Sequence, residues 1–263
     1  MRKCWLIFLL CLAGCFTNNT PPAKNELHVN FQEGDIPSLH PHEIALTLRG
    51  LSIGKTLFEG LTRIDAKGKV QLAGASRVEI SSDGLHYLFH LRDNRWSNGM
   101  IVTAAQYEAA WKKALESNCP LKELFFFIKN GSAIQRNELS MENLGVRALG
   151  KKILSVTLES PCPDFLKHLS QPVFFPLLHC KRKTQMEFNG PFLVALWDKD
   201  EHLCLKANPY FWNRENISLR QIDVFMSSDL EGIDWMEGSL CPDLKGYAID
   251  SSGAVDFSYA LFE

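Results

Sequence analysis

The most informative stretch for the fold class is Ser82-Asp83-Gly84-Leu85-His86-Tyr87-Leu88-Phe89-His90-Leu91-Arg92, because a turn signal is followed directly by a strand pattern. Asp-Gly next to an alternating segment favours a tight hairpin, since glycine accepts a positive φ without strain. After the turn, every second residue from 85 to 91 is apolar. Alternation with a period of two predicts a half-buried strand, and therefore a sheet at this point of the chain.

A helix is expected soon after this strand. Thr103 and Gln106 have the spacing of a capping box, in which the side chains of the cap residue and of the residue three positions on satisfy backbone N–H groups. The helix should continue through Leu115. Its buried face is expected to contain Tyr107, Ala110, Trp111 and Ala114.

The other apolar segments predict further strands and helices without regular alternation. Residues 27–31 predict a first strand, and the helical spacing of apolar residues over 42–61 predicts a helix. One strand pair is then expected at residues 144–149 and 153–159, and a second at residues 192–197 and 202–207. A short helix is expected at residues 163–169, and a last strand at residues 222–225. This order of elements indicates the mixed α/β class.

The first fifteen residues have the pattern of an export signal. Arg2 and Lys3 precede an apolar run over 5–12 that is too short to span a bilayer, and Ala13-Gly14-Cys15 follows. Leu12-Ala13-Gly14-Cys15 resembles the lipobox of bacterial lipoproteins, which implies that Cys15 carries the lipid. The alternative is an ordinary secretory signal that ends near a cysteine. The polar residues 16–25 are expected to be a tether between the lipid and a folded domain.

Composition limits the functions that are open to the rest of the chain. The 46% apolar and 11% aromatic content indicates a packed core. The net charge of −2 and the lack of a basic stripe make nucleic acid an unsuitable partner. Five cysteines remain after residue 15, an odd number, so their pairing stays open. They are Cys119, Cys162, Cys180, Cys204 and Cys241.

Two catalytic patterns overlap at Ser52. Gly50-Leu51-Ser52-Ile53-Gly54 matches a nucleophile elbow, and Ser52-Ile53-Gly54-Lys55 matches the Ser-x-x-Lys pattern of penicillin-interacting enzymes. An elbow needs a strand before the serine, whereas a helix is expected here. The Ser-Asp-Asn and Lys-Thr-Gly partners of the second pattern do not occur. A serine on a helix is therefore favoured, and no enzymatic activity is expected.

Histidines raise the possibility of a metal site. His86 and His90 should project from the same side of one strand, and His40 and His42 flank Pro41. Imidazoles at such spacing can bind zinc or nickel, but no carboxylate or thiolate partner is evident in the sequence. We therefore expect no metal site and no cofactor.

Several blocks of sequence, read in order, resemble one known family. They are Ile36-Pro37-Ser38-Leu39-His40-Pro41-His42, Leu57-Phe58-Glu59-Gly60-Leu61, the hairpin at Asp83-Gly84, Arg95-Trp96-Ser97-Asn98-Gly99, Thr103-Ala104-Ala105-Gln106-Tyr107, Asn189-Gly190-Pro191-Phe192 and Asn208-Pro209-Tyr210-Phe211-Trp212. The chain is similar in these blocks to the extracytoplasmic solute-binding proteins of ABC transporters, specifically the oligopeptide/dipeptide/nickel-binding family. His40 replaces the family's usual aspartate in the first block. The resemblance covers residues 26 to 240.

The resemblance implies a periplasmic-binding-protein-like α/β fold in which two lobes close on a peptide, whose partner is an ABC permease in the membrane. It places ligand contacts on the backbone near Gly34, Asp35 and Ile36. An aromatic contact of the family falls near Leu121, where Phe125 could substitute, although a buried aromatic run is the favoured role of residues 125–127.

The expected organisation is a signal with lipobox at 1–15, a tether at 16–25 and a solute-binding domain at 26–263. Within the domain, lobe one has a small domain at roughly 60–180, and lobe two starts from about 230. Members of the family are usually longer, so we expect a truncated or vestigial second lobe. The chain should be extracytoplasmic. It is expected to be a lipid-anchored binding component for peptide uptake, and the alternative is a non-transport surface lipoprotein that uses the fold for adhesion or partner binding.

Overall fold

The computed structural model describes residues 25–31, 36, 38–44, 47–65, 67–178, 186–199 and 201–226, and three two-residue strands farther on. The helices are α1 (Leu48–Leu57), α2 (Ala104–Glu116), α3 (Gly131–Gln135) and α4 (Phe165–His168), with 3-10 turns η2 (Lys122–Phe127), η3 (Met141–Asn143), η4 (Pro172–Phe174) and η5 (Arg214–Asn216). The strands are β1 (Glu26–Asn30), β2 (Thr62–Ile64), β3 (Val70–Leu72), β4 (Ala75–Ile80), β5 (His86–Leu91), β6 (Val146–Ala148), β7 (Ile153–Thr157), β8 (Phe192–Asp198), β9 (His202–Ala207), β10 (Gln221–Phe225), β11 (Trp235–Met236), β12 (Ala248–Ile249) and β13 (Val255–Asp256).

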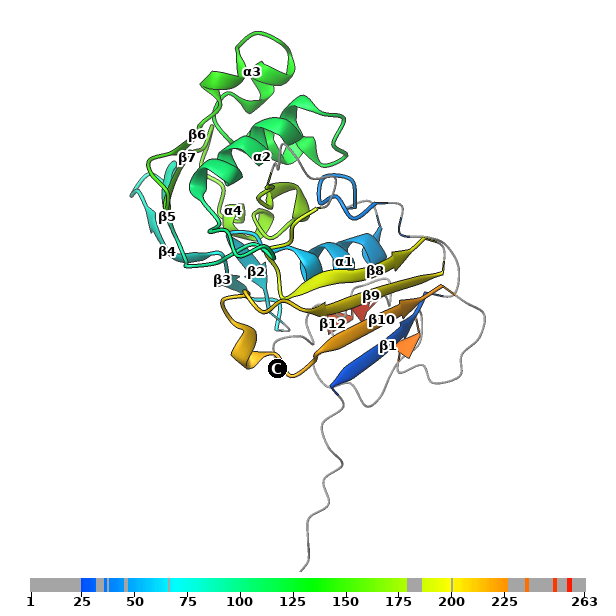
Figure 1. Ribbon diagram of the computed structural model, residues 1–263. Coiled ribbons are helices and arrows are strands. Elements are labelled where there is room, and N and C mark those ends of the chain that lie inside the picture. The colour runs from blue at the N-terminus through cyan, green and yellow to red at the C-terminus, as the bar shows by residue number, and fades with distance from the viewer. Residues whose placement is uncertain are drawn as a thin grey trace, which may run out of the picture.

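The first of two layered units is a mixed sheet with the strand order β11-β1-β10-β9-β8. β1 runs parallel to both β10 and β11, while β10, β9 and β8 are antiparallel neighbours. Leu27 and Val29 of β1 and Ile222 and Val224 of β10 are buried in the core. The sheet lies beside α1 in Figure 1. The predicted hairpin of β8 with β9 is confirmed.

The second unit is an antiparallel sheet with the order β4-β5-β7-β6, which α2 covers (Figure 1). The hairpin between β4 and β5 turns at Asp83-Gly84, as the opening motif predicts. Gly84 has φ +69°, and the Asp83 carboxylate accepts the Leu85 N–H at 3.0 Å. The predicted strands β6 and β7 also pair. The unit falls within residues 60–180, where we expect the small domain.

α2 has the predicted cap and the predicted buried face. The Thr103 N–H donates to Gln106 Oε1 at 2.8 Å, and the Trp96 indole donates to the same oxygen at 3.0 Å. Trp111 is fully buried. Its indole N–H donates to the Phe174 carbonyl at 2.7 Å, and the Phe125 and Phe174 rings lie 6.2 Å and 5.2 Å from its ring. This aromatic cluster attaches α2 to η2 and η4.

The helix expected over residues 42–61 is wrong at both ends. α1 begins after Thr47, whose hydroxyl accepts the Gly50 N–H at 3.0 Å, and it ends before Phe58, whose backbone is extended. Ile44 lies across the helix instead of continuing it. A Cβ on Gly50 would fall 1.9 Å from the Ile44 carbonyl oxygen, so only glycine permits this close approach. Apolar spacing alone could not separate a folded-back turn from another helical turn.

Several expectations concern residues that the structure does not describe. The signal at 1–15, with Cys15, and almost all of the tether at 16–25 lie outside the described residues. Among the described helices, none has both the length and the hydrophobicity that a membrane span requires. Cys119, Cys162 and Cys204 are free thiols, and Cys180 and Cys241 lie outside the described residues. At β11 the chain still pairs with β1, so the start of lobe two from about 230 stays a prediction.

Candidate functional site at the end of helix α2

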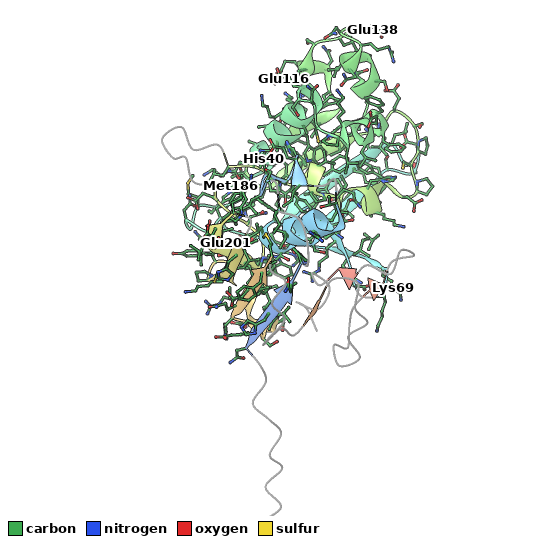
Figure 2. The ribbon with its side chains drawn as sticks, turned by 90° about the vertical axis from the view of Figure 1, so that its right-hand side faces the viewer. His40, Lys69, Glu116, Glu138, Met186 and Glu201 are labelled. Carbon is green, nitrogen blue, oxygen red and sulfur yellow. The ribbon has the colours of Figure 1, made fainter. Side chains whose placement is uncertain are left out.

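A hollow of about 440 Å³ opens at the C-terminal end of α2, and we call it the α2-end hollow. The helix ends at Glu116, which Figure 2 labels above His40. The size of the hollow is in the range of small-molecule sites, which is roughly 300–1,000 Å³. The lining residues are His40, His42, Glu43, Lys113, Ser117, Asn118, Cys119 and Pro120.

The end of α2 sets the shape and the charge of this hollow. The Ser117 N–H donates to the Lys113 carbonyl at 3.1 Å, and the Ser117 hydroxyl donates to the Ala114 carbonyl at 3.0 Å. The last carbonyls of a helix carry a partial negative charge, which a cation in the last turn complements. Lys113 supplies this cation, and its ammonium group lies 3.6 Å from the carboxylate of Glu116, so this wall carries both a cation and hydrogen-bond acceptors. Both a carboxylate and an N–H of a peptide could bind here.

The opposite wall is the segment that contains His40 and His42. Their rings meet edge to face with centroids 5.0 Å apart, and the His42 N–H donates to His40 Nδ1 at 3.2 Å. The Cys119 thiol donates to the His42 carbonyl at 3.2 Å. This bond joins the two walls, which lie 77 residues apart in the sequence. The hollow is therefore a preformed feature of the fold.

The chemistry of the α2-end hollow suits binding rather than nucleophilic catalysis. Cys119 is 4% exposed, and burial raises the pKa of its thiol. A thiol with a raised pKa stays protonated at neutral pH, whereas the thiolate is the nucleophile. Within the described residues, no group of three or more His, Cys, Asp or Glu side chains is arranged to hold a metal ion.

The structure places the predicted ligand residues in three different environments. Leu121 is half-buried and follows the hollow's Pro120, and Ile36 is buried four residues before His40. Phe125 is fully buried, with its ring 4.7 Å from that of Phe174, so it has the core role favoured for it. Gly34 and Asp35 lie outside the described residues. The hollow thus adjoins one predicted contact.

The other residues considered from sequence lie elsewhere. Ser52 is inside α1 and 3% exposed, and no strand leads into it, so the elbow geometry is absent from this part of the described chain. His86 and His90 share one side of β5, as expected. His86 contacts the Thr157 hydroxyl at 3.3 Å, and His90 contacts the Glu79 carboxylate at 2.8 Å. Each imidazole therefore has its own partner.

A second polar cluster is buried where the two units meet, and it centres on Glu59. The Arg63 guanidinium donates to Glu59 Oε1 at 3.2 Å, and the Trp212 indole donates to Oε2 at 2.5 Å. The side-chain amide of Asn189 makes two bonds to the Glu59 backbone. Its Nδ2 donates to the Glu59 carbonyl at 2.9 Å, and its Oδ1 accepts the Glu59 N–H at 3.2 Å. Arg92 stacks on Trp212 at 4.1 Å.

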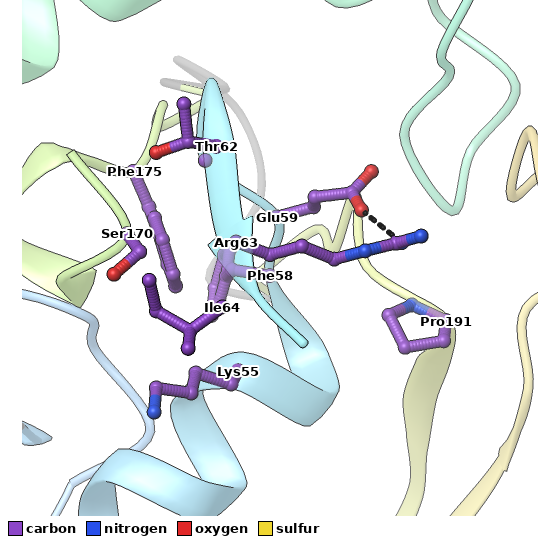
Figure 3. Close-up of a pocket in the computed structure, with 10 residues that line it drawn as sticks. Lys55, Phe58, Glu59, Thr62, Arg63, Ile64, Ser170, Phe175 and Pro191 are labelled. Carbon is purple, nitrogen blue, oxygen red and sulfur yellow. Dashed lines mark hydrogen bonds and ion pairs between the residues drawn. The ribbon is translucent and has the colours of Figure 1, made fainter. Parts of the chain in front are cut away.

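This cluster is structural rather than a ligand site. Figure 3 shows the Glu59 and Arg63 side chains side by side with their ion pair marked. The cavity next to them is about 40 Å³, which has room for water but not for a peptide. Loss of hydration by burial raises the Glu59 pKa to about 7, although Arg63, Trp212 and Arg92 lower it.

Sequence reasoning missed Lys113, Asn118 and Cys119 as lining residues. A usable signal was present, because Lys113 lies in the last turn of the predicted helix, and Asn118 and Cys119 come just before the predicted contact Leu121. The contribution of His40 and His42 was not visible, since their approach to α2 depends on the fold. The sequence raised these histidines only as metal ligands.

Comparisons with known proteins agree on one family. The family model described as bacterial extracellular solute-binding proteins, family 5 Middle, matches residues 69–231. The oligopeptide-binding protein OppA of Bacillus subtilis is 31% identical over 254 residues, covering 86% of this chain. The probable deoxycholate-binding periplasmic protein YgiS of Escherichia coli is 30% identical over 237 residues, covering 83% of this chain.

Solved structures give the same result. Peptide-bound OppA of Listeria monocytogenes superposes with a TM-score of 0.73 at 30% identity, covering 79% of this chain and 43% of that one. OppAIV of Borrelia burgdorferi gives a TM-score of 0.75 at 26% identity, covering 84% and 49%. The chain spans less than half the length of the curated relatives named above, 46% of OppA and 44% of YgiS. The expected mixed α/β, binding-protein fold is confirmed over this partial region.

Proposed function

Because the chain belongs to family 5 of the bacterial extracellular solute-binding proteins, a family of binding proteins and not of enzymes, we propose that it binds peptides for an ABC transporter. Its expected partners are a peptide ligand and the permease subunits. We propose further that a lipid on Cys15 holds it at the outer side of a bacterial membrane. Relatives named as oligopeptide-binding proteins support the ligand class.

The observation that carries this proposal is the α2-end hollow. It has the size of a ligand site, it adjoins Leu121, and it gathers cationic, acidic and hydrogen-bonding groups. A peptide carries opposite charges at its two ends and a backbone that both donates and accepts hydrogen bonds. Lys113 on the α2 wall and Glu43 on the opposite wall offer both signs of charge to such a ligand.

We place the peptide backbone along the segment that leads into this wall. An extended ligand can pair with exposed backbone as an added strand, which makes binding tolerant of side-chain sequence. Gly34, Asp35 and Ile36 begin four residues after the end of β1 and are the proposed backbone partners. Leu121 would contact a ligand side chain at the hollow's edge, and Phe125 would support the contact from the core.

A surface feature favours a second function, which is contact with a partner protein and not transport. Met100, Ile101 and Tyr210 are 52%, 42% and 46% exposed. A Cβ on Gly99, the residue before Met100, would lie 3.5 Å from the Tyr210 ring, so this ring lies against the turn that leads into Met100 and Ile101. Exposed apolar groups that gather in this way can mark an interaction site. A surface lipoprotein could use them without binding peptide.

Thermal unfolding with and without peptides separates these two functions. The probe is a mixture of tri- to pentapeptides, added in excess to the full chain carrying Cys15→Ser. A ligand that binds only the folded state stabilises it in proportion to the logarithm of its concentration. The transport function predicts a midpoint that rises with peptide concentration. A midpoint that stays constant up to the solubility of the mixture would leave only the partner-binding function.

Cys15→Ser tests the proposed lipid anchor. A serine has no thiol to form the thioether, so the chain should leave the membrane fraction and lose incorporation of labelled palmitate. The matched control is Cys11→Ser, in the same leader. This substitution should change neither the membrane association nor the palmitate incorporation. Membrane fractionation and label incorporation measure the result. Undiminished labelling of the Cys15→Ser chain would contradict the anchor.

A further inference from the structure

A second hollow, of about 290 Å³, opens beside the ends of β9 and β10 and is lined by three cationic side chains. These are Lys206, Arg214 and Arg220, and all three are exposed. The other lining residues are Pro191, Ala207, Asn208, Pro209 and Ile217, so no carboxylate lines this hollow. We call it the basic hollow. The net charge of the chain is −2, so this positive charge is a local feature.

The three cations keep their charge available to a ligand. Among the described residues, none of the acidic side chains forms an ion pair with Lys206, Arg214 or Arg220. Arg214 donates one hydrogen bond, at 3.3 Å, to the Pro209 carbonyl, which fixes one edge of its guanidinium and leaves further donors. Arginine donors in a planar fork match the oxygens of a phosphate, and lysine adds a point charge.

The position of the basic hollow favours a membrane lipid as the source of a phosphate ligand. The Arg220 N–H donates to the Asn25 carbonyl at 2.7 Å, and the Ala207 N–H donates to the Arg220 carbonyl at 2.9 Å. Asn25 ends the proposed tether, so the hollow lies where the chain from Cys15 meets the folded domain. Figure 1 shows the start of β1 and the gold segment before β10 at the same lower end. Ten residues span at most about 35 Å.

We propose that the basic hollow binds the phosphate groups of anionic phospholipids in the membrane to which Cys15 is attached. This inference rests on the proposed lipid anchor for its geometry. A lipid chain combined with a basic patch holds a protein more firmly and fixes its orientation. Contact at the basic hollow would turn the β1 end of the sheet toward the bilayer.

Co-sedimentation with vesicles tests the proposal. All chains carry Cys15→Ser, and the test variant adds Lys206→Gln, Arg214→Gln and Arg220→Gln. Vesicles consist of phosphatidylcholine alone or of equal parts phosphatidylcholine and phosphatidylglycerol. Each cation near an anionic surface strengthens binding by about fivefold, so the triple variant should bind the mixed vesicles about 100-fold more weakly. The apolar leader is common to all chains, and its contribution cancels in this comparison.

The matched control removes three exposed cations that do not line the hollow, with Lys67→Gln, Lys129→Gln and Lys151→Gln. It changes the net charge equally and should lose far less affinity. Equal losses in both triple variants would overturn the proposal, and so would equal binding of the parent to both vesicle types. Calorimetric binding of inorganic phosphate without vesicle binding would also overturn it. If Cys15 is not acylated, the palmitate assay shows it. The vesicle comparison does not change in that case, because all of its chains carry Cys15→Ser.

Discussion

Trp111→Ala should lower the free energy of unfolding by about 3–5 kcal/mol, the usual cost of removing a large aromatic side chain from a core. Trp111 is fully buried between η2 and η4, where its ring contacts those of Phe125 and Phe174. The substitution also leaves the Phe174 carbonyl without the 2.7 Å hydrogen bond from the indole. A buried carbonyl that loses its partner adds to the cost of the cavity.

Urea unfolding, followed by linear extrapolation to water, measures this change. The matched control is Trp197→Ala, because Trp197 lies on the edge strand β8 and is 37% exposed. Removal of the Trp197 side chain should lower the free energy of unfolding far less than removal of the Trp111 side chain. If the two variants lose similar amounts, the cluster around Trp111 does not attach α2 to the rest of the core as described.

Glu59→Gln should remove most of the fall in stability that the parent shows between about pH 4.5 and pH 7. The folded pKa of Glu59 is about 7 against an ordinary value of 4.5, so in this window the folded chain binds more protons than the unfolded chain. Stability then decreases as the pH rises, by up to about 3 kcal/mol. Glutamine does not titrate, and its side-chain carbonyl oxygen can still accept the hydrogen bond from the Trp212 indole N–H.

Unfolding free energies of the parent and of Glu59→Gln across pH 4 to 8 provide the test, with their difference as the readout because other groups also titrate. Glu116→Gln is the control, since Glu116 is 68% exposed and lies at the end of α2. Its profile should follow that of the parent. A Glu59→Gln profile that also follows the parent would show that the buried carboxyl is not the origin of this pH dependence.

The Glu59 cluster also explains how the two units hold a fixed relation. Its members are Glu59 after α1, Arg63 in β2, Arg92 after β5, Asn189 before β8 and Trp212 after β9. Gly190 completes the contact, because its N–H donates to the Leu57 carbonyl at 2.9 Å and a Cβ there would lie 2.6 Å from the backbone of Leu57. These contacts fix the segment after α1 against the approach to β8.

Local signals in the sequence were sufficient for much of the fold. The Asp83-Gly84 turn, the strand β5 and the capped helix α2 were predictable because each depends on residues close to one another in the chain. The start of α1 was not, since Ile44 continues the apolar spacing but folds back across Gly50.

The candidate site was harder to predict than the elements that form it. Leu121 was found through the family resemblance, but the α2-end hollow needs His42 and Cys119 in contact across 77 residues. Glu59 was visible as part of a motif, yet its bond to Trp212 spans 153 residues. Contacts of this kind follow from the assembled fold and leave no periodic pattern in the sequence.

Calorimetric titration with the tri- to pentapeptide mixture tests the central claim, that this chain binds peptide at the α2-end hollow. The full chain with Cys15→Ser is compared with the same chain carrying Asn118→Trp, which fills the hollow from an exposed lining position, and with the control Ser218→Trp, at an exposed position outside it. We predict saturable heat for the parent and the control, and none for Asn118→Trp. Equal heats in all three chains, or no saturable heat in the parent, would contradict the claim.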